Sequence, residues 1–149
     1  MRVNLYFRTF PDFDLLERKI LAETIRLLGE IQLKTKENWT KSYTAIIDTG
    51  APFSLFPLEI WQAVETEILT DTVVKGLIPK EQCVLPVKVG KITLRLIDRE
   101  EHISKPLTIM AYLAPNNKIP LIIGFQDILS ELRVHFSYKE RIAYIEEIE

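Results

Sequence analysis

One aspartate in this chain stands where a carboxylate could be held rigidly enough for acid–base chemistry. Asp48 follows the apolar residues 45–47 and is itself followed by Gly50 and Pro52. β-Branched apolar residues indicate a buried strand, and glycine with proline indicates an abrupt turn directly after it. An acid at the end of a buried strand can be oriented by neighbouring backbone amides, as general acid–base catalysis requires. Asp48 is therefore the candidate catalytic residue, and the alternative is a turn aspartate that bonds only to its own backbone.

The other reactive side chains form no recognisable site. The two histidines and the single cysteine of the chain give no spacing typical of a zinc site and allow no internal disulfide. Neither histidine gives Ser54 the context of a catalytic triad, so we expect a turn or helix-start hydroxyl there and not a nucleophile. Cys83 is expected to be a small apolar strand residue, and His135 is expected to face solvent. We expect no metal ion and no cofactor.

Length and composition predict one globular domain over residues 1–149. The chain is 47% hydrophobic with a formal net charge of -2, and a domain of this size buries roughly 70% of its unfolded surface. This charge balance argues against nucleic acid as a partner. The longest uncharged, apolar-rich stretch, residues 106–117, falls short of the ~20 residues of a membrane helix. With no signal-peptide pattern and one cysteine, the sequence predicts a cytoplasmic protein that does not bind membranes.

Hydrophobic periodicity predicts a mainly β chain with one or two short helices. Residues 14–28 fit either a helix or an extended chain, and that choice stays open. The polar residues 36–42 would join two strands into a hairpin, residues 98–102 a charged surface loop, and residues 146–149 a solvated tail. Strands are predicted over residues 2–8, 29–35, 43–47, 72–78, 83–89, 91–97, 107–113, 120–124, 133–137 and 142–145, and helices over 57–68, where Trp61 would pack inward, and 126–132.

The residues around Asp48 resemble the active-site signature of retropepsin-like aspartic proteases. The match is Asp-Thr-Gly-Ala at residues 48–51, with apolar residues before it and Ser54 shortly after it. Ile-Ile-Gly at residues 122–124, with a helix expected near Asp127, resembles the second element of the family. The resemblance spans about residues 29–145. It implies a closed β-barrel, in which the second element lies beside the active-site turn and the hairpin between the motifs forms a flap over the substrate.

The resemblance also implies an aspartic endopeptidase that acts as a homodimer on peptide or protein substrates. Members use two facing aspartates, and this chain has one such motif, so a twofold dimer would place Asp48 opposite its symmetry mate. Two such carboxylates repel each other and share one proton. The ionised one would take a proton from the water that attacks the peptide carbonyl, while its protonated partner donates to the carbonyl oxygen. The alternative is a catalytically silent dimer of this fold that binds peptides or serves assembly.

The same resemblance assigns supporting roles around the aspartate. Thr49 would hydrogen-bond across the dimer, and Gly50 would let the substrate backbone approach closely. Ala51 stands where pepsin-like relatives carry a hydroxyl that donates to the carboxylate, so we expect a less acidic pH optimum. Ser54 and Gly124 complete the set that supports the site.

The sequence departs from the family pattern at two places and also in the expected flap. Phe125 stands where the family often has arginine, and residues 98–105 resemble an insertion. The expected flap tip, residues 79–82, contains no glycine, so it should open less freely than a glycine-rich tip. The residues expected to cover an extended peptide by strand-like pairing are Gly76, Leu77 and Ile78.

Overall fold

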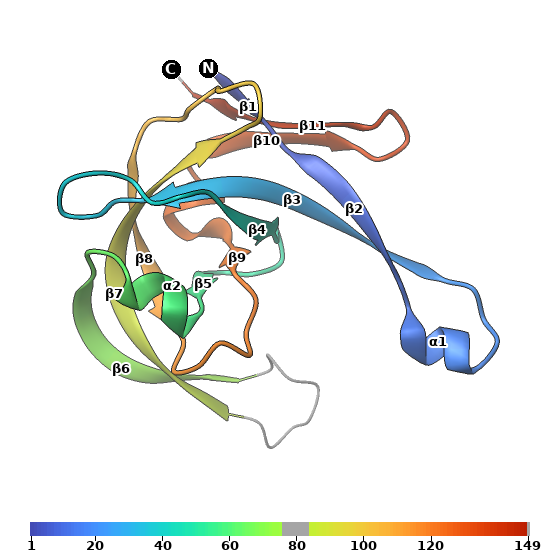
Figure 1. Ribbon diagram of the computed structural model, residues 1–149, viewed down its shortest axis with the longest axis horizontal. Helices are drawn as coiled ribbons and strands as arrows, with labels where there is room; N and C mark the ends of the chain where they lie inside the picture. Colours follow the sequence, from blue (N-terminus) through green and yellow to red (C-terminus); the bar gives the residue numbers. More distant parts are fainter. Residues whose placement is uncertain (76–83, 149) are drawn as a thin grey trace.

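The computed structural model describes residues 1–75 and 84–148, which form a mainly β structure, as predicted (Figure 1). The short helices are α1 (Phe13–Glu17), α2 (Leu58–Gln62) and the irregular η1 (Phe125–Leu129). The strands are β1 (Arg2–Asn4), β2 (Tyr6–Pro11), β3 (Glu23–Leu33), β4 (Tyr43–Ile47), β5 (Ser54–Phe56), β6 (Glu67–Lys75), β7 (Val84–Ile97), β8 (Leu107–Leu113), β9 (Ile122–Ile123), β10 (Leu132–Ser137) and β11 (Ile142–Glu147).

Two sheets organise these strands. The smaller has the order β1-β11-β10, and the larger has the order β2-β3-β4-β9-β5-β8-β7-β6, with β3 also pairing with β7. The pairs β4–β9 and β5–β8 are parallel, and the other pairs are antiparallel. The short strand β9 therefore lies between β4 and β5, so a segment from the last third of the chain reaches the turn that follows residue 47.

Side chains from both sheets share one hydrophobic core. Alternate residues of β7 and β8 point inward, as the two-residue period of a strand requires. Trp61 packs inward from α2 and donates from its indole nitrogen to the Ala114 carbonyl oxygen at 2.8 Å, as the helix pattern predicted. The largest fully buried apolar side chains are Phe56, Ile31, Leu33, Ile92, Leu94, Leu96, Ile109, Leu113, Ile123 and Ile128.

The first third of the chain corrects two sequence interpretations. The single strand predicted over residues 2–8 is two strands in different sheets, because Leu5 turns inward and donates its backbone N–H to the Ala143 carbonyl oxygen. The ambiguous residues 14–28 contain both structures that fitted them. Asp12 caps α1 by accepting from the Leu15 N–H, and β3 begins at Glu23 through pairing with β2.

Three further element predictions are wrong in their bounds. The helix predicted over 57–68 ends at Gln62, because Ile68 pairs with Gly90 in the β6–β7 hairpin. The strands predicted on either side of Gly90 are one strand, β7. A Cβ on Gly90 would lie 2.7 Å from a Leu113 methyl group, so this glycine permits close packing and does not form a turn. The helix predicted over 126–132 is broken by non-helical backbone at Asp127, whose φ is 65°.

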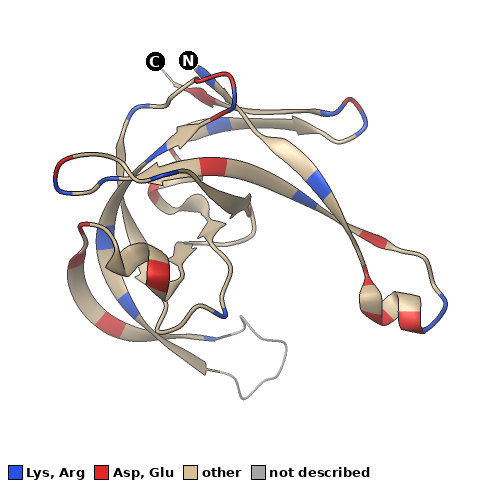
Figure 2. Cartoon of the chain, in the orientation of Figure 1, with Lys and Arg blue, Asp and Glu red and all other residues tan. Residues whose placement is uncertain are grey.

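The chain's end is more ordered than the sequence predicted. Glu146 and Glu147 belong to β11, which is held between β1 and β10, so they do not form a solvated tail. The Glu146 carboxylate lies 3.7 Å from the imidazole of His135, which is solvent-exposed, as expected, and stacks on Tyr144. Acidic and basic residues are interspersed along the described part of the chain (Figure 2). Within residues 1–75 and 84–148, none of the helices has the length and apolar character that a membrane crossing needs.

The predicted charged surface loop contains a buried carboxylate. The Asp98 side chain is only 5% exposed and accepts hydrogen bonds from the backbone N–H groups of Asn4, Glu100 and His102 and from the His102 ring. Burial opposes ionisation of this carboxyl, but the hydrogen bonds from Asn4 and His102 outweigh it, so the pKa of Asp98 lies below its usual value. Asp98 therefore ties the N-terminal strand to the β7–β8 connection.

We expect Asp98→Asn to lower the free energy of unfolding by about 1–3 kcal/mol at pH 7, because an amide cannot satisfy all four donors. A lowered pKa in the folded state stabilises the protein above the unfolded pKa, and this stabilisation is lost as the pH falls through the folded value. The deficit should therefore shrink near pH 3. Denaturant unfolding at both pH values measures it, with the exposed Glu100→Gln as control. An equal deficit at both pH values would contradict this account.

Candidate functional site

Asp48 follows directly on β4, as the sequence predicted. Its backbone N–H donates to the Ile123 carbonyl oxygen at 2.9 Å, which continues the parallel β4–β9 ladder by one residue. Its carboxylate accepts from the Gly50 N–H at 2.9 Å, and the Ala51 N–H donates to the Asp48 carbonyl oxygen at 3.2 Å. The acid is thus oriented by its own turn and by β9. We call residues 48–53 the Asp48 turn.

The second motif is tied to the Asp48 turn at several points. The Gly124 N–H donates to the Ser54 hydroxyl at 3.0 Å, and the Ser54 side chain is fully buried. Ser54 therefore belongs to strand β5, which corrects the expected turn or helix-start hydroxyl, and burial leaves it no access to a substrate. The Phe125 N–H donates to the Ala51 carbonyl oxygen and the Gln126 N–H donates to the Pro52 carbonyl oxygen, both at 2.9 Å. Backbone contacts thus hold the segment around Phe125 against the Asp48 turn.

Gly124 occupies a position with no room for a side chain. A Cβ there would lie 2.5 Å from the Phe53 carbonyl oxygen and 2.7 Å from that of Ala51, and both are backbone atoms that cannot rotate away. The glycine thus lets the second motif approach the Asp48 turn.

Gly124→Ala should lower the free energy of unfolding by about 1–3 kcal/mol, since strand β9 and the Asp48 turn must separate to admit a methyl group. Thermal unfolding measures the change. Gly50→Ala is the matched control, because a Cβ at Gly50 meets only an Asp48 carboxylate oxygen, at 3.3 Å. Equal stability of the two variants would show that the close approach at Gly124 contributes nothing.

The Asp48 carboxylate lies in a groove of about 470 Å³. Its lining comes from the end of β6, with Val73 and Lys75, from the Asp48 turn and from β8. The rings of Phe53 and Tyr112 lie 4.8 Å apart in this lining. The groove is therefore lined by both apolar and polar groups, and its ionisable side chains among the described residues, tyrosine aside, are one carboxylate and one ammonium group.

Sequence reasoning placed some of these groups and missed others. Asp48, Gly50 and Ala51 line the groove, whereas Thr49 is exposed on the same turn. Tyr112 was missed, although its place opposite Leu55 in the β5–β8 pair brings it beside the turn. The base of the expected flap is present as the antiparallel β6–β7 hairpin. Its expected covering residues and Cys83 lie outside the described residues.

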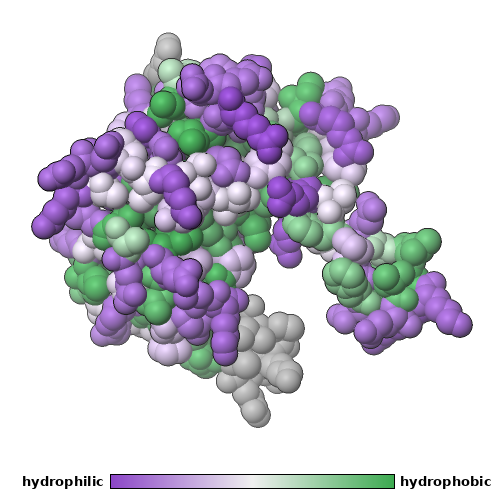
Figure 3. Space-filling model, viewed as in Figure 1, coloured by the Kyte–Doolittle hydropathy of each residue, from purple (hydrophilic) through white to green (hydrophobic). Residues whose placement is uncertain are grey.

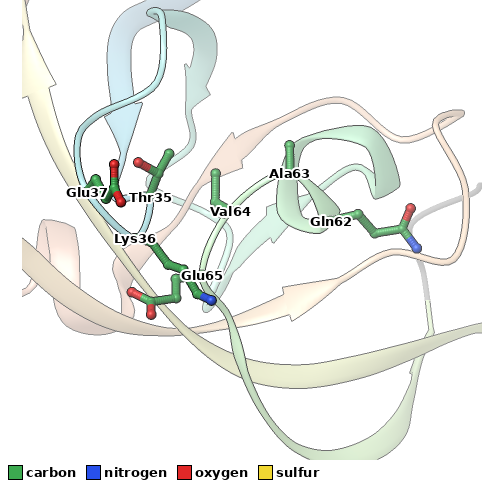
Figure 4. A pocket seen from close by; sticks show the side chains of 7 residues that line it. All are labelled: Thr35, Lys36, Glu37, Gln62, Ala63, Val64 and Glu65. Atoms are coloured by element: carbon green, nitrogen blue, oxygen red, sulfur yellow. The ribbon is translucent and has the colours of Figure 1, made fainter.

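A second hollow does not combine with this site. It has a volume of about 610 Å³ and lies between the β3–β4 connection and the residues that follow α2 (Figure 4). Its ionisable side chains are Lys36, Glu37 and Glu65, and it does not include Asp48. In the described part of the chain, no three histidine, cysteine, aspartate or glutamate side chains gather as metal ligands would. The groove at Asp48 is thus the candidate site.

No protein-family model matches this chain, and a search of curated proteins also found no match.

Proposed function

We propose that this protein is a retropepsin-like aspartic endopeptidase that acts as a homodimer. The observation that carries the proposal is the placement of Asp48 at the end of strand β4, oriented by the Gly50 N–H and by β9, in a groove that the end of β6 also lines. A carboxylate fixed in this way beside a peptide-sized groove suits general acid–base chemistry.

The strand order supports the proposed fold. The pairings run β3–β4, β4–β9, β9–β5, β5–β8, β8–β7 and β7–β3, so that they return to the strand from which they began. We propose that this ring is the closed barrel of the family. In such a barrel, β9 would support the Asp48 turn from the inside of the fold, as Ser54 and Gly124 do through their hydrogen bond.

The proposed mechanism needs two copies of the chain, because each supplies one aspartate of this motif. A twofold axis beside the Asp48 turn would bring the two carboxylates together. Two close negative charges cannot both remain ionised without a large repulsion, so the pair holds one proton. The ionised carboxylate activates a water molecule as a base, and the protonated one donates to the carbonyl oxygen of the peptide. Thr49, exposed on the same turn, is available to bond across the axis.

The groove favours an extended peptide with apolar side chains near the cut. Its walls are built by aliphatic and aromatic groups of β6, β8 and the Asp48 turn. In the described part of the larger sheet, β6 is the last strand, so its outer backbone groups can pair with a peptide laid along it.

The test is cleavage of an unfolded protein between pH 3 and pH 7 at concentrations at which sedimentation shows a dimer. Peptide-bond hydrolysis supports the proposal, with an optimum less acidic than that of the pepsin-like enzymes because Ala51 provides no hydroxyl. A dimer that cleaves nothing over this range overturns it and favours the silent binding module.

A further inference from the structure

A long two-stranded arm projects from the body of this protein. We define the arm as residues 6–28, which comprise β2, α1 and the first half of β3. The arm strands pair with each other from Tyr6↔Leu28 to Pro11↔Glu23. Strand β3 pairs with β4 only from Leu28 onward and with β7 only from Glu30 onward. In the described structure, the outer part of the arm thus has only its own two strands as pairing partners.

The tip of the arm has a defined conformation of its own. Asp12 accepts from the Leu15 N–H, the Asp12 N–H donates to the Ala22 carbonyl oxygen, and the Ile20 N–H donates to the Leu15 carbonyl oxygen. The connection between the strands is therefore closed by local hydrogen bonds and presents a fixed surface.

That surface exposes large apolar side chains among charged ones. Helix α1 has no buried residue, and Leu21 and Phe13 are 89% and 69% exposed. An isolated two-stranded hairpin is marginally stable in water, and grouped exposed apolar side chains mark interaction sites. The exposed large apolar side chains of the arm are Phe10, Phe13, Leu16, Ile20, Leu21 and Ile25.

The position of the arm indicates what covers it. The arm leaves the body on the side where the β4–β5 connection, which contains Asp48, reaches the surface, and its tip extends well beyond that connection (Figure 1). The space-filling view shows open space between the arm tip and the body (Figure 3). A twofold axis beside the Asp48 turn would place the second body on this same side. A segment that reaches past the turn would then lie beside the partner.

We propose that the arm embraces a second copy of this chain and contributes its apolar tip to the dimer interface. This inference rests on the homodimer proposed above. Each arm would bring the exposed apolar side chains of its tip to the contact, chief among them Phe13 and Leu21. The arm would stabilise the dimer, and an active site shared between two chains exists only while the two chains stay together.

The double variant F13S/L21S tests the arm. Because both side chains are exposed, the fold of each chain should survive, which thermal unfolding checks. We expect the dimer dissociation constant, measured by sedimentation, to rise about tenfold or more. The control is I68S/L69S, which removes two exposed apolar side chains from the start of β6, on the side of the body away from the arm (Figure 1). An unchanged dissociation constant in the arm variant, or an equal rise in the control, overturns the proposal.

Hydrogen exchange at residues 12–22 shows whether the arm tip is covered by a second copy of the chain or by the body of the same chain. Slower exchange at concentrations above the dissociation constant than below it supports an arm buried by a partner. Equal protection at every concentration overturns it, because the arm would then be covered within one chain.

Cleavage assays separate the two proposals. If the arm variant loses cleavage at low concentration and regains it at high concentration, the arm serves the dimer that forms the site. If the arm variant dimerises and cleaves like wild type, the arm proposal is wrong and the endopeptidase stands. If the arm variant weakens a dimer that never cleaves, the arm proposal stands and the endopeptidase is wrong.

Discussion

Replacing Asp48 with asparagine should reduce peptide-bond cleavage by at least about 10³-fold. In a homodimer the substitution removes both carboxylates at once, so no group remains to take a proton from water or to donate one to the carbonyl oxygen. General acid–base catalysis by one residue typically contributes about 10²–10⁴-fold, and here two residues are lost together. The measurement is the rate of cleavage of an unfolded protein at the pH optimum of the wild type.

The structure makes asparagine a nearly isosteric test. Within residues 1–75 and 84–148, the Asp48 carboxylate accepts one hydrogen bond, from the Gly50 N–H, and an amide oxygen can accept the same bond. The fold and the dimer should therefore be retained, as checked by thermal unfolding and sedimentation. The matched control is Asp71→Asn, which removes an exposed carboxylate of β6 that pairs with Lys88. Cleavage that survives in Asp48→Asn, or that is lost equally in Asp71→Asn, would exclude Asp48 as the catalytic acid.

The sequence predicted well those elements in which local pattern and tertiary pairing agree. Strands β4 and β8 match their predicted bounds, because in each the alternating apolar residues and the turn that follows define where the strand begins and ends. Asp48 was placed correctly for the same reason. The prediction of a mainly β chain is confirmed.

The failures have a common physical cause. Ile68 repeats at helical spacing after Ile60 and Val64, yet it pairs in β6, since a long hairpin with β7 stabilises the extended form over local propensity. Gly90 resembled a turn, but it makes room for Leu113 in an unbroken strand. Asp98 resembled a solvated loop charge, and only its distant partner Asn4 shows that it is buried. Each error concerns a contact between residues far apart in the chain, which single-sequence patterns do not contain.

Mixing wild type with an excess of Asp48→Asn chains should lower the cleavage rate far more than the same dilution of wild type alone. If each site takes one aspartate from each chain, a mixed dimer holds a single carboxylate and cannot divide the acid and base roles. With a ninefold excess of the variant and free exchange of chains, a wild-type chain meets another in about one pairing in ten. Cleavage per wild-type chain should therefore fall about tenfold.

Chain exchange gives this experiment its internal control. Inhibition should develop over the time that dimers need to dissociate, whereas sequestration of substrate by inactive dimers would act as soon as the proteins are mixed. Replacing the excess variant with a ninefold excess of wild type should instead leave cleavage per chain unchanged. If the excess of Asp48→Asn never lowers the rate, each chain acts alone, and the divided dyad is wrong even if Asp48 itself proves essential.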